Sequence, residues 1–383
     1  MDNFTFRNPT KILFGKGQIA ALATEVPAQA RVLMTYGGGS IKANGVYEQV
    51  KAALGSRTIV ELGGIEPNPR YETLMKGVEL VRAHQLDFLL AVGGGSVADG
   101  TKFIAAAVPF TEGDPWKILA EGAVVESAMP LACVLTLPAT GSEMNTAAVI
   151  SRGDQKLAFL SPLVFPVFSI LDPETTFSLP PRQIANGVID SFVHVMEQYM
   201  TFPAGAPLQD RLAESILVTL TEIGPKLLAS PRDYDLHATF MWTATMALNG
   251  VISVGVPQDW ATHVIGHELT ALHGTDHART LAVVMPSLLN VKRAAKREKL
   301  LQWAERVWGI REGDPEQRID AAIAKLRAFF ESMGAPTRLS GHGIPASVAE
   351  VVEKRLAARK VTSIGERGDI TPAVVRRILA EAA

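Results

Sequence analysis

The stretch 88–99 reads FLLAVGGGSVAD and joins an apolar run, a glycine turn and the start of a helical pattern. The run Phe88–Val92 is apolar at every position, as expected for a strand that is covered on both faces of a sheet. Three glycines follow at positions 93–95, and the pattern then becomes helical over Val97–Ala107. A strand, a tight turn and a helix in this order are typical of a βαβ unit in a parallel sheet.

The same pattern recurs on both sides of this unit. Further strands are predicted at Arg31–Tyr36, Thr58–Leu62, Cys133–Leu137 and Val167–Leu171, and helices at Gly45–Leu54 and Tyr71–His84. The stretch Phe4–Phe14 also has an extended pattern and is predicted to form an edge strand. Strands that alternate with helices predict the α/β fold class with a parallel sheet.

The second half of the chain has a different pattern. After Leu179-Pro180-Pro181 the strand signals nearly disappear. Helical spacings of three and four replace them, and they place one apolar stripe toward a core at Ile319, Ile323, Leu326 and Phe330. We therefore predict an α/β domain over residues 1–178 and an all-helical domain over residues 179–383.

Length and composition limit the classes of protein that fit. The chain has 383 residues, of which 47% are hydrophobic and 20% charged, as in a globular protein of two domains. The net charge of −2 disfavours a nucleic-acid partner, because such proteins are usually strongly basic. Cys133 is the only cysteine, so no intramolecular disulfide can form. The N-terminus lacks the pattern of a signal peptide, and no apolar run reaches the ~18 residues of a membrane span. We expect a cytoplasmic protein with no membrane partner.

The glycine turn at 93–98 fits the dinucleotide-binding pattern G-x-G-x-x-A. Glycines let backbone N–H groups approach a phosphate closely, and the helix that follows presents unpaired donors and a favourable dipole. A tight βα turn without a ligand has the same pattern, so both interpretations stay open on this motif alone. The turn Thr136–Glu143, which follows the predicted strand Cys133–Leu137, carries hydroxyls that suit either phosphate and ribose contacts or ordinary helix capping.

A second glycine turn, Gly37–Ser40, follows the strand that ends at Tyr36. In many NAD enzymes a carboxylate near this position binds the ribose 2′-hydroxyl. Here Ser40, Ile41 and Lys42 follow instead. A small hydroxyl beside a cation suits a 2′-phosphate, so we predict NADP rather than NAD.

The histidines are unevenly distributed. Of eight in the chain, four fall within fifteen residues: His263, His267, His273 and His277. Asp190 and His194 are separated by four positions in a helical pattern, which places both side chains on one face, and Glu197 continues that stripe. A carboxylate and an imidazole on one helix, facing imidazoles from another segment, can hold a divalent metal. A polar network at a helix interface is the alternative, and spacing alone does not choose among the four clustered histidines.

Taken together, these motifs make the sequence similar to the iron-containing (group III) alcohol dehydrogenase superfamily, and most similar to its NADPH-dependent aldehyde reductase and butanol dehydrogenase branch. The resemblance extends over essentially the whole chain. It rests on Tyr36–Ser40, Glu66–Pro69, Gly93–Lys102, Thr136–Glu143, Leu171–Glu197 and Trp260–His277. The last two blocks are the most specific, because they place one carboxylate and three imidazoles at the family's spacing.

The resemblance implies a role for each motif. The metal ligands would be Asp190, His194, His263 and His277. The cofactor contacts would be Gly38, Ser40, Gly94, Gly95, Ser96, Asp99, Thr136, Thr140, Asn145 and Lys156. It also implies a Rossmann-like N-terminal domain, a helical metal domain with the site between the two, and a homodimer or larger homo-oligomer. The implied reaction is hydride transfer from NADPH to a metal-polarised aldehyde, giving a primary alcohol.

Several points stay open at this level. The proton for the alkoxide would come from His267, from His273 or from water. Asp with three His suits both zinc and iron, and we place zinc ahead. One rival function is a metal- and NAD-dependent lyase of the dehydroquinate-synthase type, and the other is a metal-stabilised binding protein without catalysis. The lyase is disfavoured because Arg279 is nearly alone among cations in the metal motifs. Their apolar neighbours, Trp260, Leu272, Leu281 and Val284, suit an uncharged aldehyde.

Overall fold

The computed structural model describes all residues 1–383, and the chain forms two compact units. The sheet unit comprises residues 7–180 and 232–245, and the helical unit comprises residues 1–6, 181–231 and 246–383. Two segments therefore depart from a single division of the chain at residue 178. The first six residues pack with the helical unit, and residues 232–245 pack with the sheet unit.

The sheet unit is built on six parallel strands in the order β1-β8-β5-β4-β2-β3. The strands are β1 (Lys11–Phe14), β2 (Arg31–Tyr36), β3 (Thr58–Leu62), β4 (Phe88–Gly94), β5 (Leu131–Leu137) and β8 (Phe168–Leu171). The predictions for β2 and β3 have the observed bounds, while β4 continues two residues further into the glycine turn. The extended N-terminal stretch contributes the edge strand β1, which is shorter than predicted. A separate antiparallel hairpin consists of β6 (Ala147–Arg152) and β7 (Gln155–Leu160).

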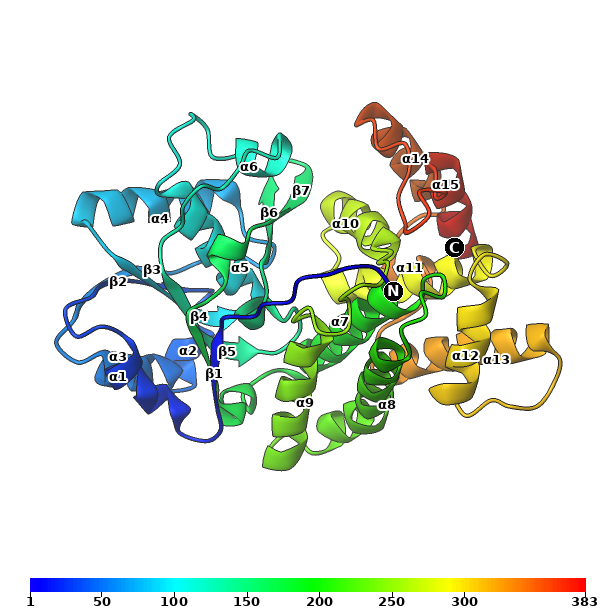
Figure 1. Cartoon of the computed structure of the whole chain (residues 1–383), viewed down its shortest axis with the longest axis horizontal. Helices are drawn as coiled ribbons and strands as arrows, with labels where there is room; N and C mark the ends of the chain where they lie inside the picture. The colour runs from blue at the N-terminus through cyan, green and yellow to red at the C-terminus, as the bar shows by residue number, and fades with distance from the viewer. The chain divides into compact units, whose positions relative to one another are not determined.

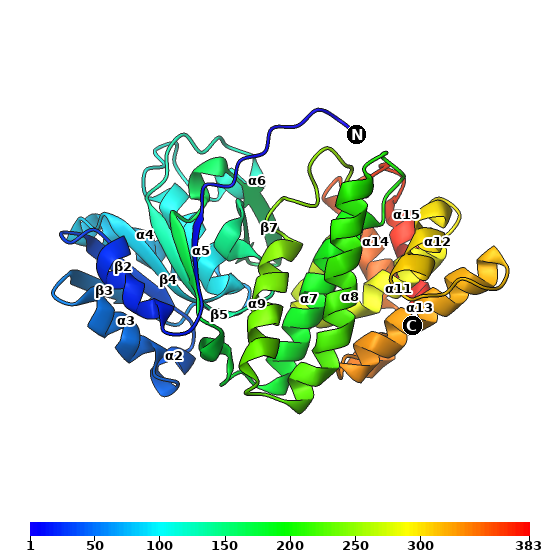
Figure 2. The same cartoon turned by 60° about the horizontal axis from the view of Figure 1, so that its bottom comes forward.

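Helices cover both faces of this sheet, as Figures 1 and 2 show. The helices α4 (Tyr71–His84) and α5 (Gly95–Ala107) pack against the face that carries Leu33 and Leu89. On the opposite face, α1 (Leu22–Glu25) and α3 (Val46–Leu54) pack against Val32 and Leu90. Adjacent residues of one strand therefore belong to different cores. This double coverage explains why the strands are mostly apolar and do not alternate between apolar and polar residues.

The strand order creates a switch point at the carboxyl end of the sheet. The chain leaves β2 toward β3 on one side, and it returns to β4 on the other side of β2. In open α/β sheets, ligands bind in the crevice at such a point. The glycine turns after β2 and β4 therefore lie at neighbouring strand ends, and the turn after β5 lies beside them.

A buried lysine connects α5 to the turn after β5. The ammonium of Lys102 donates to the backbone and side-chain oxygens of Asn145, at 2.8 and 2.9 Å, and to the backbone oxygen of Ala147 at 2.9 Å. One helical turn earlier, the carboxylate of Asp99 accepts hydrogen bonds from Ser142 Oγ and the Val149 backbone N–H. Burial lowers the pKa of Lys102 to about 8 and raises that of Asp99. These two polar residues hold the turn and the hairpin against α5.

The helix α9 (Tyr234–Ala247) comes from the second half of the chain but packs on the sheet unit. Met241 joins a small core with Leu135 and Leu171 at the ends of β5 and β8. His237 Nδ1 lies 2.6 Å from Thr176 Oγ1, and Thr245 Oγ1 donates to the carboxylate of Glu143. These partners lie 61 and 102 residues away in sequence, so no local pattern indicates the pairing.

The helical unit is assembled around α7, which is buried on almost every side. Its helices are α7 (Pro181–Tyr199), α8 (Pro207–Ala229), α10 (Ala261–His273), α11 (His277–Val291), α12 (Arg297–Arg306), α13 (Pro315–Ser332), α14 (Val348–Ala358) and α15 (Pro372–Glu381). α10 packs closely on α11, since a Cβ at Gly266 would lie 2.9 Å from both Leu281 and Thr280. None of the helices is both long and apolar enough to cross a membrane.

Candidate functional site

Four side chains from three helices converge inside the helical unit. Asp190 and His194 lie one turn apart on α7, and both are buried. His263 comes from the first turn of α10, and His277 is the first residue of α11. The structure therefore brings together the four residues that the family resemblance implies as metal ligands.

The polar atoms of these residues face one another. His194 Nε2 lies 3.8 Å from Asp190 Oδ1, and His277 Nε2 lies 3.7 Å from the same oxygen. The ring of His194 stacks on the ring of His263, with 4.7 Å between centroids. One ligand atom each from Asp190, His263 and His277 can be chosen so that all three lie within 4.8 Å of one another.

This arrangement fits a divalent cation. Asp190 Oδ1 is buried and accepts no hydrogen bond, although a carboxylate without a partner is costly to bury. Ligands at the ~2.0–2.2 Å typical of zinc lie roughly 3.3 Å apart in a tetrahedron, slightly closer than the spacings found here. Three imidazoles and one carboxylate are also a donor set that suits zinc or iron.

Two acidic residues outside the group contact its histidines or their sequence neighbours. Glu197 Oε1 lies 3.1 Å from His263 Nδ1. Asp276, directly before His277, accepts hydrogen bonds from Arg182 Nε at 2.7 Å and Asn186 Nδ2 at 2.9 Å. Burial alone would raise the pKa of Asp276, but these two hydrogen bonds lower it. The network joins the N-terminus of α11 to α7. The one sequence signal for it is the four-residue spacing of Asn186 and Asp190, which places both side chains on one face of α7.

The other two clustered histidines occupy different positions. The ring of His267 lies 5.0 Å from that of His277 and 6.3 Å from that of His263, so it is next to the group. His273 is exposed at the last turn of α10, and it belongs to no ring contact with the group. A proton path through His273 therefore has no support in this geometry.

The apolar surroundings differ from the sequence expectation. Leu281 and Val284 are fully buried in helix packing, so they do not line an open surface near the histidines. Trp260 does lie against the group, with its ring edge-to-face on His263 at 5.1 Å. Its backbone adopts the left-handed region at φ 64°, which is a strained conformation for a bulky residue.

The predicted cofactor residues lie together at the carboxyl end of the sheet. Gly94, Gly95 and Ser96 form the end of β4 and the first turn of α5, and Gly38 and Ser40 follow β2. A Cβ at Gly95 would meet Thr140 Oγ1 at 2.3 Å, so this glycine is required by packing. Thr136 ends β5, and Lys156 lies on β7.

Several of the predicted cofactor residues have hydrogen-bond partners within the protein, and Asn145 and Asp99 have the most. The amide of Asn145 donates to Thr140 O and accepts from Lys102 and the Ala147 backbone. Asp99 is bonded to Ser142 and Val149, as described above. Their side chains shape the turn, a role that the sequence motif does not distinguish from cofactor contact. Lys42, beyond Ser40, is exposed and lies 4.9 Å from the ring centroids of both Tyr36 and Tyr47.

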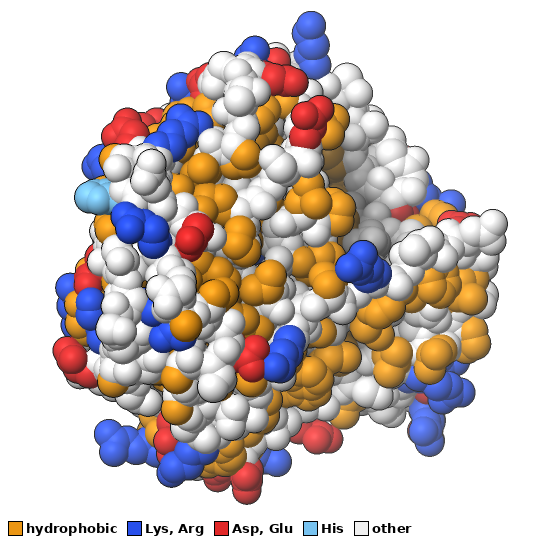
Figure 3. Space-filling model, turned by 60° about the vertical axis from the view of Figure 1, so that its left-hand side comes forward, with side chains coloured by type: hydrophobic (Ala, Val, Ile, Leu, Met, Phe, Trp, Pro, Cys, Tyr) orange, Lys and Arg blue, Asp and Glu red, His pale blue; other side chains and the backbone are white.

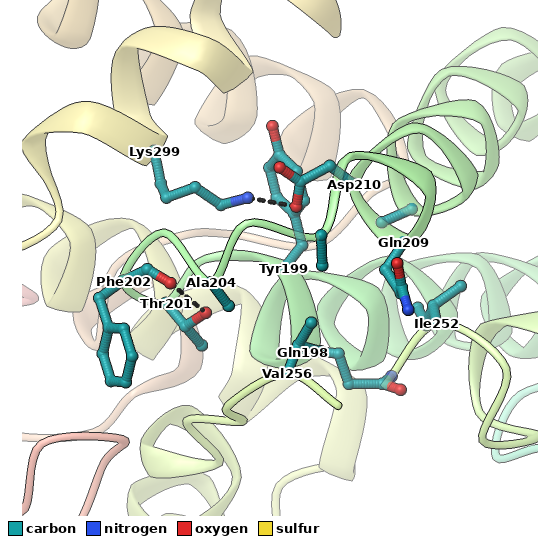
Figure 4. Close-up of a pocket in the computed structure, with 12 residues that line it drawn as sticks. Gln198, Tyr199, Thr201, Phe202, Ala204, Gln209, Asp210, Ile252, Val256 and Lys299 are labelled. Atoms are coloured by element: carbon teal, nitrogen blue, oxygen red, sulfur yellow. Dashed lines mark hydrogen bonds and ion pairs between the residues drawn. The ribbon is translucent and has the colours of Figure 1, made fainter. Parts of the chain in front are cut away.

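A small pocket lies near the end of α7 but contains none of the histidines. Figure 4 shows it between Gln198 and Tyr199 of α7, Asp210 of α8 and Lys299 of α12. The Lys299 ammonium bonds to Asp210 at 2.5 Å and lies over the Tyr199 ring. These groups satisfy one another, so we assign the chemistry to the histidine group and not to this pocket.

Comparison with known families matches almost the entire chain. The model of the iron-containing alcohol dehydrogenases matches residues 9–173, and that of the C-terminal part of the Fe-containing alcohol dehydrogenase family matches residues 184–382. The chain belongs to the iron-containing alcohol dehydrogenase family. This confirms both the predicted family and the predicted fold class.

Several members of this family are similar over nearly their full length. The NADPH-dependent aldehyde reductase YqhD of Escherichia coli (strain K12) is 60% identical over 383 residues, which is 99% of each chain. The probable NADH-dependent butanol dehydrogenase 1 of Bacillus subtilis (strain 168) is 44% identical over 351 residues, which is 90% of each. The crystal structure of E. coli K-12 YqhD matches with a TM-score of 0.98 at 58% identity, covering 100% of this chain and 99% of that one.

Gly38 offers a test of where the cofactor lies. Its φ is outside the left-handed region, and a Cβ there would have no protein atom within 4 Å. Gly38→Ala should therefore keep the free energy of unfolding within about 0.5 kcal/mol of the wild type. A methyl group against a closely bound cofactor should raise the KM for NADPH about tenfold, or ~1.4 kcal/mol. Steady-state kinetics and urea unfolding measure the two effects, and an unchanged KM would place the cofactor elsewhere.

Proposed function

We propose that this chain catalyses the NADPH-dependent reduction of aldehydes to primary alcohols, and the reverse reaction. The observation that carries the proposal is the group formed by Asp190, His194, His263 and His277, of which all but His277 are buried, in a chain that also has a glycine turn at the switch point of a parallel sheet. The 60% identical relative is named as an NADPH-dependent aldehyde reductase.

The charges of the histidine group suit an aldehyde substrate. A divalent metal held there would act as a Lewis acid on the carbonyl oxygen, and NADPH would supply the hydride. Asp190 contributes one negative charge and the neutral imidazoles contribute none, so the bound site keeps a net positive charge. The helical unit also buries Asp190 and His194, which excludes water and strengthens the electrostatic attraction between this charge and the carbonyl oxygen.

His267 is our candidate for the group that passes a proton to the product. It is partly exposed, it lies beside His277, and an imidazole has an ordinary pKa of ~6.5. His267→Gln should lower kcat about 10²-fold, within the usual range for loss of a general acid, without loss of metal. His273→Gln is the matched control, because this exposed histidine belongs to the same helix. Equal kcat values for the two variants would remove His267 from the reaction.

The coenzyme preference follows from this chain's own residues. Relatives named as NADH-dependent are 44% identical, so family membership does not decide the coenzyme. The turn after Tyr36, residues 37–42, has no carboxylate that would repel a 2′-phosphate, and it has Ser40 and the exposed cation Lys42 instead. These residues support NADPH.

The metal, the assembly and the location are further parts of the proposal. We propose zinc ahead of iron on the donor set, although the family takes its name from iron. We propose a homodimer, which sedimentation measures directly. The surface that supports a homodimer is the outer edge of β1, which has no neighbouring strand and beside which Phe14 and Trp242 stay 39% and 42% exposed.

We place the protein in the cytoplasm. Charges of both signs are interspersed on the face in Figure 3, as suits small-molecule substrates better than nucleic acid.

The lyase alternative fits the site less well. Such an enzyme needs free cations for a phosphorylated and carboxylated substrate. Arg182 is paired with Asp276, and Arg279, two residues after His277, donates to the backbone oxygen of Gly334. Both are therefore already engaged within the protein.

The deciding experiment is the rate of NADPH consumption by metal-loaded protein with butanal, with NADH measured in parallel. The proposal predicts a fast rate with NADPH and a much slower one with NADH. A fast rate with NADH would keep the enzyme class and contradict the role of Ser40 and Lys42. No rate with either coenzyme, in protein shown to contain metal, would favour the lyase or the non-catalytic binding protein.

A further inference from the structure

The face of α7 that carries Asp190 and His194 also carries Glu197, three residues further along. Glu197 is 2% exposed and is aimed at α10. Its Oε1 accepts a hydrogen bond from the backbone N–H of His263 at 2.9 Å, and it lies 3.1 Å from the ring nitrogen Nδ1 of the same residue. One carboxylate oxygen therefore contacts both the main chain and the side chain of His263.

The contact with the ring decides which nitrogen carries the proton. In its ionised form the Glu197 carboxylate can only accept hydrogen bonds, and Nδ1 of His263 is then the donor. A neutral imidazole with its proton on Nδ1 has its lone pair on Nε2. Glu197 thus leaves Nε2 as the nitrogen that His263 offers to a metal, and Nε2 is also the atom that His194 and His277 turn toward Asp190.

Contacts with the main chain fix where the His263 ring lies. His263 is the third residue of α10, so its N–H has no acceptor within the helix. Glu197 supplies that acceptor, and its backbone oxygen also accepts from the Asp259 N–H at 2.8 Å. Asp259 is held from the other side by the Lys296 ammonium at 2.5 Å. These bonds surround Trp260, whose left-handed backbone they help to stabilise.

We propose that Glu197 is the positioning residue of the metal centre, which sets the tautomer and the orientation of His263 and so tightens metal binding. The inference rests on the proposed metal site. Carboxylates that hold a ligating histidine typically change metal affinity 10–100-fold. Neither the resemblance nor the helical spacing assigns this role, because the partner atoms come from a helix 66 residues away.

Metal affinity tests the proposal through two variants. Glu197→Ala removes the acceptor for both groups of His263, and we expect the dissociation constant for zinc to rise at least tenfold. Glu197→Gln should have a smaller effect, because its amide oxygen still accepts from both groups while the charge is lost. The amide of this variant should keep its oxygen toward His263, because the opposite orientation would place its NH2 group against the backbone N–H of His263. Competition with a chromophoric zinc chelator measures the constants on full-length protein, without any activity assay.

The matched control is Glu214→Gln on α8. Glu214 is also a buried carboxylate, 7% exposed, and it accepts from the Tyr199 hydroxyl at 2.9 Å, but it contacts no histidine. The zinc affinity of the Glu214→Gln variant should equal that of the wild type, even if the unfolding temperature of the variant is lower. A change of less than tenfold in Glu197→Ala, or an equal change in Glu214→Gln, would overturn the proposal. A wild-type protein that binds no zinc or iron would overturn the metal centre itself, which is a different result.

Discussion

A buried carboxylate oxygen without a hydrogen-bond partner is the constraint on which the proposed metal centre depends. Asp190 lies on a helix that is enclosed on nearly every side, and its Oδ1 accepts no hydrogen bond from the protein. Burying such a charge is costly unless an opposite charge is brought to it. The three imidazoles that face Asp190 come from α7, α10 and α11, so a cation bound there, as we propose, would couple the packing of these helices to metal binding.

The helix α7 organises this part of the molecule along one face. Asn186, Asp190, His194 and Glu197 follow one another at spacings of four, four and three. The middle two belong to the group that we propose holds the metal, while the outer two contact Asp276 and His263 of the partner helices. A substitution on this face would therefore affect the ligand set even where it touches no ligand directly. In the sheet unit, Lys102 and Asp99 are likewise buried polar residues of one helix, and they hydrogen-bond to the turn after β5.

Much of the sheet could be predicted from sequence because its strands are covered on both faces. Uniformly apolar runs such as Phe88–Val92 end at glycine turns, and both signals are local. The position of α9 could not be predicted, because its partners Glu143 and Thr176 are distant in sequence. Within the site, clustering indicated the histidines, but only the fold separates His267 from the exposed His273. Leu281 shows the same limit, since an apolar residue near a motif can face the core instead.

Anomalous X-ray diffraction from crystals of the metal-loaded protein, collected on both sides of the zinc and iron absorption edges, would locate the metal and identify it. We expect a single strong peak about 2.0–2.2 Å from a carboxylate oxygen of Asp190 and from Nε2 of His194, His263 and His277. The edge at which the peak appears identifies the metal. A peak bound by other residues, or none in this group of side chains, would contradict the central claim.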